Sequence, residues 1–133
     1  MNYWLLKTEP STYSFDDLVR EKRTRWDGIT NPAALKQLRA AMKGDLTFIY
    51  HTGDEKRAVG TAEIVRTAYD DPKSGLAVVD LAVRDALAAP VTLATLKLDP
   101  LFADSPLVRQ GRLSFVPLTA VQAKRILGLG GVR

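Results

Sequence analysis

The stretch Tyr3-Trp4-Leu5-Leu6-Lys7-Thr8-Glu9-Pro10 opens the chain and decides how its fold begins. A short aromatic and apolar run that a proline stops is typical of a strand, so we expect a strand over residues 3–7. Polar side chains at the end of a strand, beside a rigid proline, predict the rim of a pocket. Lys7, Thr8 and Glu9 are therefore candidate ligand-binding residues, and the alternative is an exposed, charged turn.

A second stretch, Trp26-Asp27-Gly28-Ile29-Thr30-Asn31, places an aromatic ring beside hydrogen-bonding groups at a turn. Proteins commonly hold nucleobases in this way, stacked on aromatic rings and read along the base edge. Trp26 is the candidate stacking wall, and burial in the core is its alternative. Asp27 could accept a hydrogen bond from an exocyclic amine or cap the turn. Gly28 and Ile29 would offer backbone N–H groups.

The remaining pattern alternates between helices and strands. Ser14 is a suitable N-cap for a short helix that ends near residue 22, and residues 26–28 are expected to form a loop. Asn31 and Pro32 predict the start of a second helix, with Gly44 as its C-terminal cap. This N-cap role competes with ligand binding by Asn31, and we favour the cap.

From residue 46 onward the pattern favours strands. We expect strands over residues 46–51, 58–69, 76–83 and 113–116, a turn over residues 70–75 and a connection over residues 86–90. A short helix is expected over residues 93–98, and a closing helix follows the capping box at Thr119. The fold class is therefore α+β, with a small, highly curved, mainly antiparallel sheet or barrel and helices packed at its ends.

Length and composition exclude several classes of protein. A chain of 133 residues predicts one domain over 1–133. Without cysteine it has no disulfide, thiolate zinc site or cysteine nucleophile, and His51 is its sole histidine. We therefore expect no metal and no cofactor. Because no basic leader or long apolar run is present, we also expect no signal peptide and no membrane span. We further expect a cytoplasmic location and a monomer.

The chain carries 19 Lys and Arg against 15 Asp and Glu, a net charge of +4, and the basic residues are clustered. Clustered cations can neutralise phosphates and release counterions, although they can equally form a solvated face. The candidate phosphate-binding residues are Arg23, Arg25, Lys36, Arg109 and Arg112.

Four further polar residues are candidates for contact with a base. Tyr50, His51 and Thr52 end the strand that follows the second helix, and Ser114 lies in the last strand. Burial in the core is the alternative for Tyr50, and a structural role is the more common one for an isolated histidine such as His51. Trp4, which lies between apolar neighbours, is interpreted as a core residue.

Several motifs, in this order and at these spacings, resemble the EVE domain of the PUA-like superfamily nearly from end to end. The matching segments are Tyr3–Pro10, Tyr13-Ser14, Asp17-Leu18, Trp26–Ile29 with Asn31, Met42–Asp45, Phe48–Thr52, Val59–Glu63 and Arg109–Ser114. The resemblance implies a PUA-like pseudobarrel, related to YTH and ASCH domains, that reads a modified base in nucleic acid. It also implies a nuclease as a partner. Thr30, Pro32 and Leu35 stand where the family often carries Arg or Tyr, so two contacts to phosphate or base are missing.

Two other functions stay open at this point. A small nucleotide-directed enzyme could use His51 with Asp27 or Glu9 as an acid–base pair, although no catalytic motif accompanies these residues. A protein–protein adaptor would need no chemistry at all. The expected function is a binding module without catalytic residues, which reads either modified cytosine in DNA or a modified base in RNA.

Overall fold

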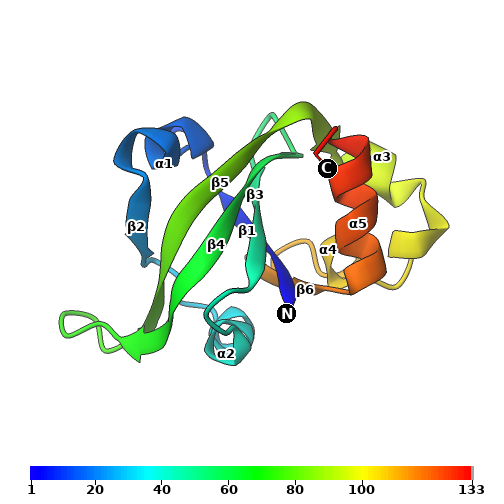
Figure 1. The fold of residues 1–133 in the computed structure, drawn as a ribbon. Helices are drawn as coiled ribbons and strands as arrows, with labels where there is room; N and C mark the ends of the chain where they lie inside the picture. The colour runs from blue at the N-terminus through cyan, green and yellow to red at the C-terminus, as the bar shows by residue number, and fades with distance from the viewer. Residues whose placement is uncertain (133) are drawn as a thin grey trace.

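A single six-stranded sheet organises the computed structural model, which describes residues 1–132 (Figure 1). Its strands are β1 (Tyr3–Thr8), β2 (Arg23–Trp26), β3 (Leu46–His51), β4 (Arg57–Asp70), β5 (Ala77–Thr92) and β6 (Phe115–Leu118). Their order is β2-β5-β4-β3-β1-β6. The pair β1–β3 is parallel and the other pairs are antiparallel, so the sheet is mixed. The predicted α+β class is confirmed.

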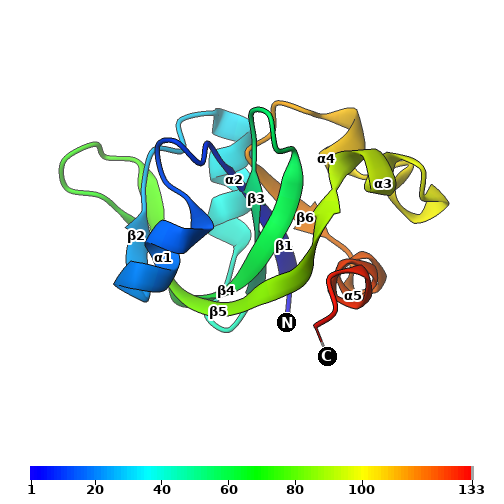
Figure 2. The same ribbon diagram turned by 90° about the horizontal axis from the view of Figure 1, so that it is seen from above.

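Helices surround this curved sheet, as Figure 2 shows from above. They are α1 (Phe15–Glu21), α2 (Pro32–Ala40), α3 (Leu93–Lys97), η1 (Pro100–Phe102), α4 (Pro106–Arg109) and α5 (Ala120–Leu129). Within residues 1–132 no ladder joins the edge strands β2 and β6, so the sheet curves without closing. Helix α2 packs against β6 on one side and against β5 and β4 on the other. It therefore covers the gap that pairing would close in a barrel.

Local capping explains where the helices begin. The Ser14 hydroxyl accepts from the Asp17 amide while the Asp17 carboxylate accepts from the Ser14 amide, and Thr119 and Gln122 form the same reciprocal pair before α5. Asn31 accepts from the amides of Ala33 and Ala34 at the start of α2. Each cap supplies acceptors to amides that have no partner within the helix.

The strand predictions need three corrections. The predicted loop over residues 26–28 begins one residue later, because Trp26 ends the edge strand β2, which was not predicted and which pairs with β5 from Arg23↔Ala82 to Trp26↔Val79. The expected connection over residues 86–90 is instead a continuation of β5 to Thr92, with several register shifts against β4. The last strand begins two residues later than predicted and includes Pro117.

The helix predictions need two corrections. Helix α2 ends at Ala40, and Gly44 lies beyond it in the turn before β3, with a φ of 95°. The short elements η1 and α4 were not predicted, although each begins with a cap and a proline, Asp99-Pro100 and Ser105-Pro106.

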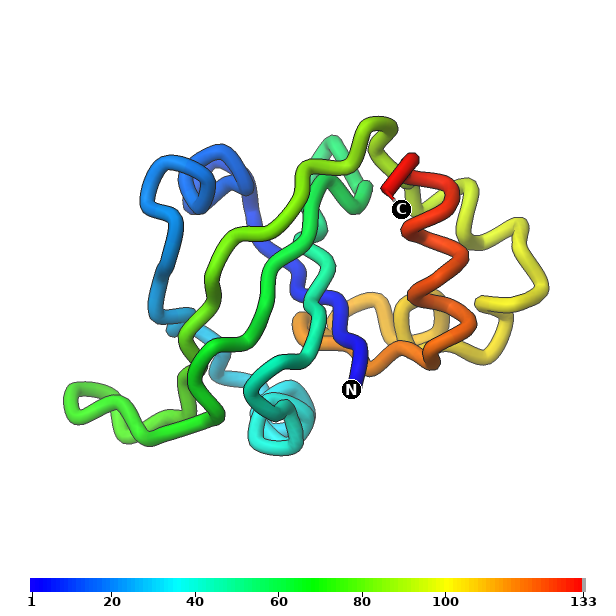
Figure 3. Tube along the Cα trace, in the orientation of Figure 1, coloured from blue at the N-terminus to red at the C-terminus, as the bar shows by residue number. Residues whose placement is uncertain are grey.

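The core lies inside the curve of the sheet. Trp4 is buried and stacks on Phe115, with ring centroids 4.9 Å apart, which confirms that it is a core residue. The trace in Figure 3 shows β2 beside β5 at one side of the molecule, and the β4–β5 turn projecting past the sheet. The end of β1, helix α1 and strand β2 therefore meet at the side opposite α5.

Candidate nucleic-acid interface

A cavity of about 540 Å³ opens between the end of β1, the segment before α1, and β2 with its following loop; we call it the Trp26 cavity. Its lining residues are Lys7, Thr8, Glu9, Thr12, Tyr13, Glu21, Thr24, Arg25, Trp26, Asp27, Gly28, Ile29 and Ser114. Eight of the twelve predicted base-binding residues are therefore brought together here. Small-molecule sites commonly span about 300–1,000 Å³, so a single nucleobase fits this volume.

Trp26 borders the cavity, but most of its indole is covered. Only 8% of the residue is exposed, and the Tyr13 ring meets the indole edge-on, with centroids 5.5 Å apart and planes at 85°. The two rings belong to different elements, since Tyr13 precedes α1 and Trp26 ends β2. The cavity therefore has two aromatic walls, and the indole offers it a limited surface in this conformation.

The Tyr13 hydroxyl donates a hydrogen bond to the carboxylate of Glu21, the last residue of α1. Burial, together with the bond to Glu21, raises the pKa of Tyr13 to about 12. The phenol is therefore protonated at neutral pH and stays a hydrogen-bond donor.

The end of β1 forms one rim of the cavity and is hydrogen-bonded to two other segments of the chain. The Thr8 hydroxyl donates to the Tyr13 carbonyl (2.7 Å), and the Lys7 ammonium donates to the Gly111 carbonyl (2.8 Å). The Lys7 amide also donates to the Ser114 carbonyl. Burial lowers the pKa of Lys7. These contacts hold residues far apart in the sequence at one rim.

The loop after β2 supplies the opposite rim. Gly28 has a φ of 89°, a conformation that L side chains rarely adopt, and a Cβ there would meet nothing within 4 Å. Asp27 is exposed, and its carboxylate receives no hydrogen bond from residues 1–132. It therefore does not cap the turn at Gly28 and is free to accept from a ligand.

Four predicted base-binding residues lie outside the lining and support it instead. Asn31 caps α2, and Tyr50 is buried, which raises the pKa of its phenol. The Thr52 hydroxyl donates to the Thr8 carbonyl and to Glu9, both at 3.3 Å. His51 is treated separately, because it bears on the enzyme hypothesis.

Both ring nitrogens of His51 are engaged. Nε2 accepts from the Phe15 amide (3.0 Å), and Nδ1 lies 2.9 Å from the Glu55 carboxylate. Because Nε2 accepts a hydrogen bond, the ring proton must be on Nδ1, which donates a hydrogen bond to the Glu55 carboxylate. The hydrogen bond from His51 lowers the pKa of Glu55. The structure therefore pairs His51 with Glu55 rather than with Asp27 or Glu9, and the proposed acid–base pair does not form.

The five predicted phosphate-binding residues are dispersed. Arg25 lines the Trp26 cavity, and both Arg23 and Arg25 line a second cleft. Lys36 is exposed on α2, and Arg112 is exposed beyond Gly111. Arg109 is engaged locally, since its guanidinium donates to the Ala103 carbonyl (2.9 Å) and to Asp104 (3.1 Å).

Four lining residues were missed from the sequence: Thr12, Tyr13, Glu21 and Thr24. Tyr13 carried a usable signal, because it is an aromatic residue between a proline turn and a helix cap. Thr24 would have followed from recognising the alternation of Arg23-Thr24-Arg25-Trp26 as an edge strand. In the described chain no helix is long and apolar enough to cross a membrane, and no three His, Asp or Glu residues gather as metal ligands.

Comparison with known proteins now identifies the architecture. The model of the EVE domain matches residues 2–129. The chain belongs to the EVE domain family. Its PUA-like fold, expected from the sequence motifs, is thereby confirmed.

Three relatives are similar to this chain. The structure of Rpa0253 from Rhodopseudomonas palustris is 39% identical with a TM-score of 0.92, covering 98% of this chain and 94% of that one. The human THYN1 protein, solved in complex with DNA containing 5-methylcytosine, is 26% identical with a TM-score of 0.89, covering 100% and 99%.

Thymocyte nuclear protein 1 of Rattus norvegicus is 37% identical over 82 residues, which are 53% of this chain and 36% of the rat protein. The match to this curated relative therefore spans only about a third of its length. The activity of the whole rat protein does not transfer to this EVE domain by that match alone.

Proposed function

We propose that this chain binds nucleic acid and holds a modified base in the Trp26 cavity. The observation that carries the proposal is the cavity itself, which has two aromatic walls and a polar rim. The human relative bound to DNA containing 5-methylcytosine supports the choice of ligand. The proposed function needs no covalent step. A nuclease partner stays a prediction of the family resemblance, and a monomeric state stays a prediction from the sequence.

In this proposal the base enters between the loop after β2 and the end of β1. Trp26 contacts one face of the base, and Asp27 accepts a hydrogen bond from its exocyclic amine. Because the Tyr13 ring covers part of the indole, Tyr13 turns aside and releases its hydrogen bond to Glu21 when the base lies flat. Selectivity comes from the fit around the modified atom, since one added methyl group changes binding by about 1–3 kcal/mol.

The test is a titration with matched oligonucleotides that carry cytosine, 5-methylcytosine, 5-hydroxymethylcytosine, adenine or N6-methyladenine, each as DNA and as RNA. We expect one modified base to bind more tightly than its unmodified form. Trp26→Leu should weaken that complex roughly five- to hundredfold, the effect of about 1–3 kcal/mol of base–aromatic stacking. Trp26→Phe, which keeps a ring, should retain part of the preference.

Asp27→Asn is the second variant, because the exposed Asp27 side chain can change without disturbing the core. It should alter the preference between bases while the thermal unfolding of the protein stays unchanged. Equal affinity of the wild type for all oligonucleotides, modified or not, would overturn the proposal. Loss of preference only in variants that no longer fold would not count in its favour.

A further inference from the structure

A second cleft, of about 330 Å³, lies next to the Trp26 cavity and is lined by Arg23, Thr24, Arg25, Tyr69 and Asp80. We call it the Arg23 cleft. It shares Thr24 and Arg25 with the Trp26 cavity, so the edge strand β2 borders both. Because β2 is an edge strand, a ligand held in the first cavity can pass around it to reach the second.

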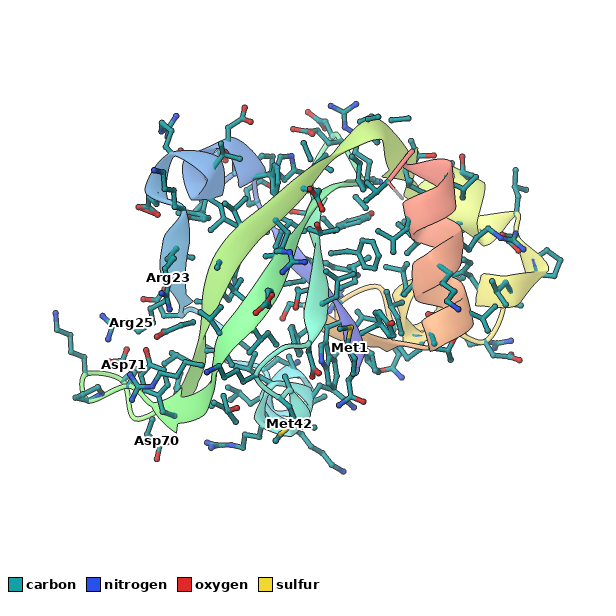
Figure 4. The ribbon with its side chains drawn as sticks, viewed as in Figure 1. Met1, Arg23, Arg25, Met42, Asp70 and Asp71 are labelled. Carbon is teal, nitrogen blue, oxygen red and sulfur yellow. The ribbon has the colours of Figure 1, made fainter. Side chains whose placement is uncertain are left out.

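Strand register brings the basic side chains of this cleft together. Arg25 and Arg66 both lie opposite Asp80 of the intervening strand β5, and Arg23 lies opposite Ala82 two residues along. Figure 4 shows Arg23 and Arg25 leaving β2 at the outer margin of the sheet, near Asp71 of the β4–β5 turn. Arg23 and Arg25 of β2 therefore line the cleft, and Arg66 of β4 lies beside it, next to the lining residues Asp80 and Tyr69.

Arg66 is held in place by an aromatic ring. Its guanidinium carbon lies 3.6 Å from the centroid of Tyr69, whose hydroxyl donates to Asp80 (2.6 Å). A guanidinium stacked on a fixed ring is preorganised, and its N–H groups stay available at the ring edge.

Among the described residues, the acidic groups of the region leave Arg23 and Arg66 without ion-pair partners. Asp80 accepts from Tyr69, and Asp71 accepts from the Lys73 amide and lies 3.9 Å from Arg25. Within residues 1–132 no carboxylate forms an ion pair with Arg23 or Arg66. Exposed arginines without carboxylate partners are suited to phosphate, which a guanidinium binds through paired N–H groups.

We propose that the Arg23 cleft binds the phosphodiester backbone that flanks the base held in the Trp26 cavity, with Arg23 and Arg66 as its main contacts. This inference rests on the proposed function. It also gives the path of the bound nucleic acid: its phosphodiester backbone runs over β2 toward the β4–β5 turn. Arg109, already engaged by Asp104, lies outside that course.

The test compares wild type with the double variant Arg23→Gln/Arg66→Gln, using duplex DNA with a central 5-methylcytosine and the same duplex unmodified. Arg125→Gln on α5 is the control, because it removes one arginine charge at the opposite side of the molecule (Figure 1). Binding is measured from about 50 to 200 mM salt, where the slope reports the phosphates neutralised, about 0.9 per phosphate on a duplex.

The double variant should lose about tenfold or more in affinity for both duplexes, with their affinity ratio unchanged and the salt slope lowered by one to two phosphates, roughly 0.9–1.8. Arg125→Gln should stay close to wild type. An affinity and slope equal to those of Arg125→Gln would overturn the inference.

The two proposals fail in different ways. If wild type shows no preference for any of the modified oligonucleotides but the double variant still loses affinity and slope, the base-reading proposal falls and the cleft is supported. If preference for the modified base is present and the double variant binds like wild type, only the cleft is overturned. Absence of salt-dependent binding by wild type to these duplexes and to all the DNA and RNA oligonucleotides would overturn both.

Discussion

The buried carboxylate of Asp45 holds the first residues of the chain in place. Its carboxylate accepts from the Trp4 indole (2.9 Å), the Met42 amide (2.8 Å) and the Asn2 amide (2.9 Å). Burial alone would raise the pKa of Asp45, but these hydrogen bonds outweigh it and hold the pKa below its ordinary value of 3.8. The carboxylate thus links β1 to the turn before β3.

The depressed pKa of Asp45 predicts an acid-sensitive fold. The stability contributed by this group is fully present above pH 3.8, the ordinary value, and is lost as the pH falls through the lower pKa of the folded state. Asp45→Asn should reduce the free energy of unfolding at neutral pH by about 1–3 kcal/mol, because one amide oxygen replaces two acceptor oxygens. Its stability should also change less than that of wild type below pH 3.8.

Urea unfolding followed by tryptophan fluorescence at several pH values measures both effects. Asp54→Asn, a change at an exposed loop carboxylate, is the matched control and should follow wild type throughout. Equal stability of Asp45→Asn and wild type at neutral pH would contradict this account.

Thr47 and Thr61 form a natural comparison between two buried threonines. The Thr47 hydroxyl has no hydrogen-bond partner in the described structure, whereas Thr61 accepts from the Asp85 amide (3.1 Å) and donates to its carbonyl (3.3 Å). A buried polar group without a partner costs about 1–3 kcal/mol. Thr47→Val should therefore raise the melting temperature, and Thr61→Val should lower it. Calorimetry distinguishes the two, and a lowered value for Thr47→Val would refute the prediction.

Individual site residues were predictable where local chemistry was distinctive. Asp27 and Gly28 lie at the rim because a turn former follows an aromatic residue, and Asn31 was favoured as a cap because proline follows it. Tyr13 and Glu21 were not foreseen, since their place depends on how α1 packs beside β2, which no local pattern encodes. His51 ended a strand as expected, but its partners Phe15 and Glu55 come from tertiary packing.

Among the elements, β2 shows most clearly why a short edge strand escapes prediction. Its four residues alternate arginines with Thr24 and Trp26, and only β5 pairs with it. Exposed arginines on such a strand resemble a solvated loop in the sequence. The continuation of β5 past Val83 was missed for a related reason, because alanine and proline are poor strand formers and pairing with β4 compensates for this low propensity.

Helix α1 is positioned by the contact between Phe15 and Gly60 of β4. A Cβ at Gly60 would lie 2.2 Å from the Phe15 ring. Gly60→Ala should therefore displace Phe15 and lower the free energy of unfolding by about 1–3 kcal/mol, the usual cost of overpacking. Since α1 carries Glu21 beside the Trp26 cavity, the variant should also weaken ligand binding.

A double-mutant cycle checks this contact. Phe15→Leu/Gly60→Ala should be destabilised by less than the sum of the two single variants, because the smaller side chain leaves room for the added methyl group. Gly111→Ala, where a Cβ meets nothing within 4 Å, is the control. Strict additivity in urea unfolding would show that Phe15 does not limit the space at Gly60.

Taken as a whole, the molecule builds its two neighbouring hollows from segments that the sequence keeps apart. The end of β1, the segment from Thr12 to Trp26, and Ser114 meet only because β1 lies between β3 and β6 while β2 pairs with β5 at the far edge. The general fold followed from sequence patterns and family motifs. The convergence of these segments did not, since it depends on the strand order and on α2 covering the open side of the sheet.

This arrangement predicts a discontinuous footprint in hydrogen exchange. When an oligonucleotide with the preferred modified base is bound, amides of residues 7–13, 24–29 and 111–114 should exchange more slowly together. Amides of α5, at the opposite side of the sheet (Figure 1), should be unaffected. With ligand at about 100 times its Kd, binding should also stabilise the protein by about 2.7 kcal/mol and raise its melting temperature.

The unmodified oligonucleotide at the same concentration should protect the same segments from hydrogen exchange less, because its occupancy is lower. Protection confined to α5, or limited to one of the three segments, would mean that the ligand does not occupy the cavity formed by all of them.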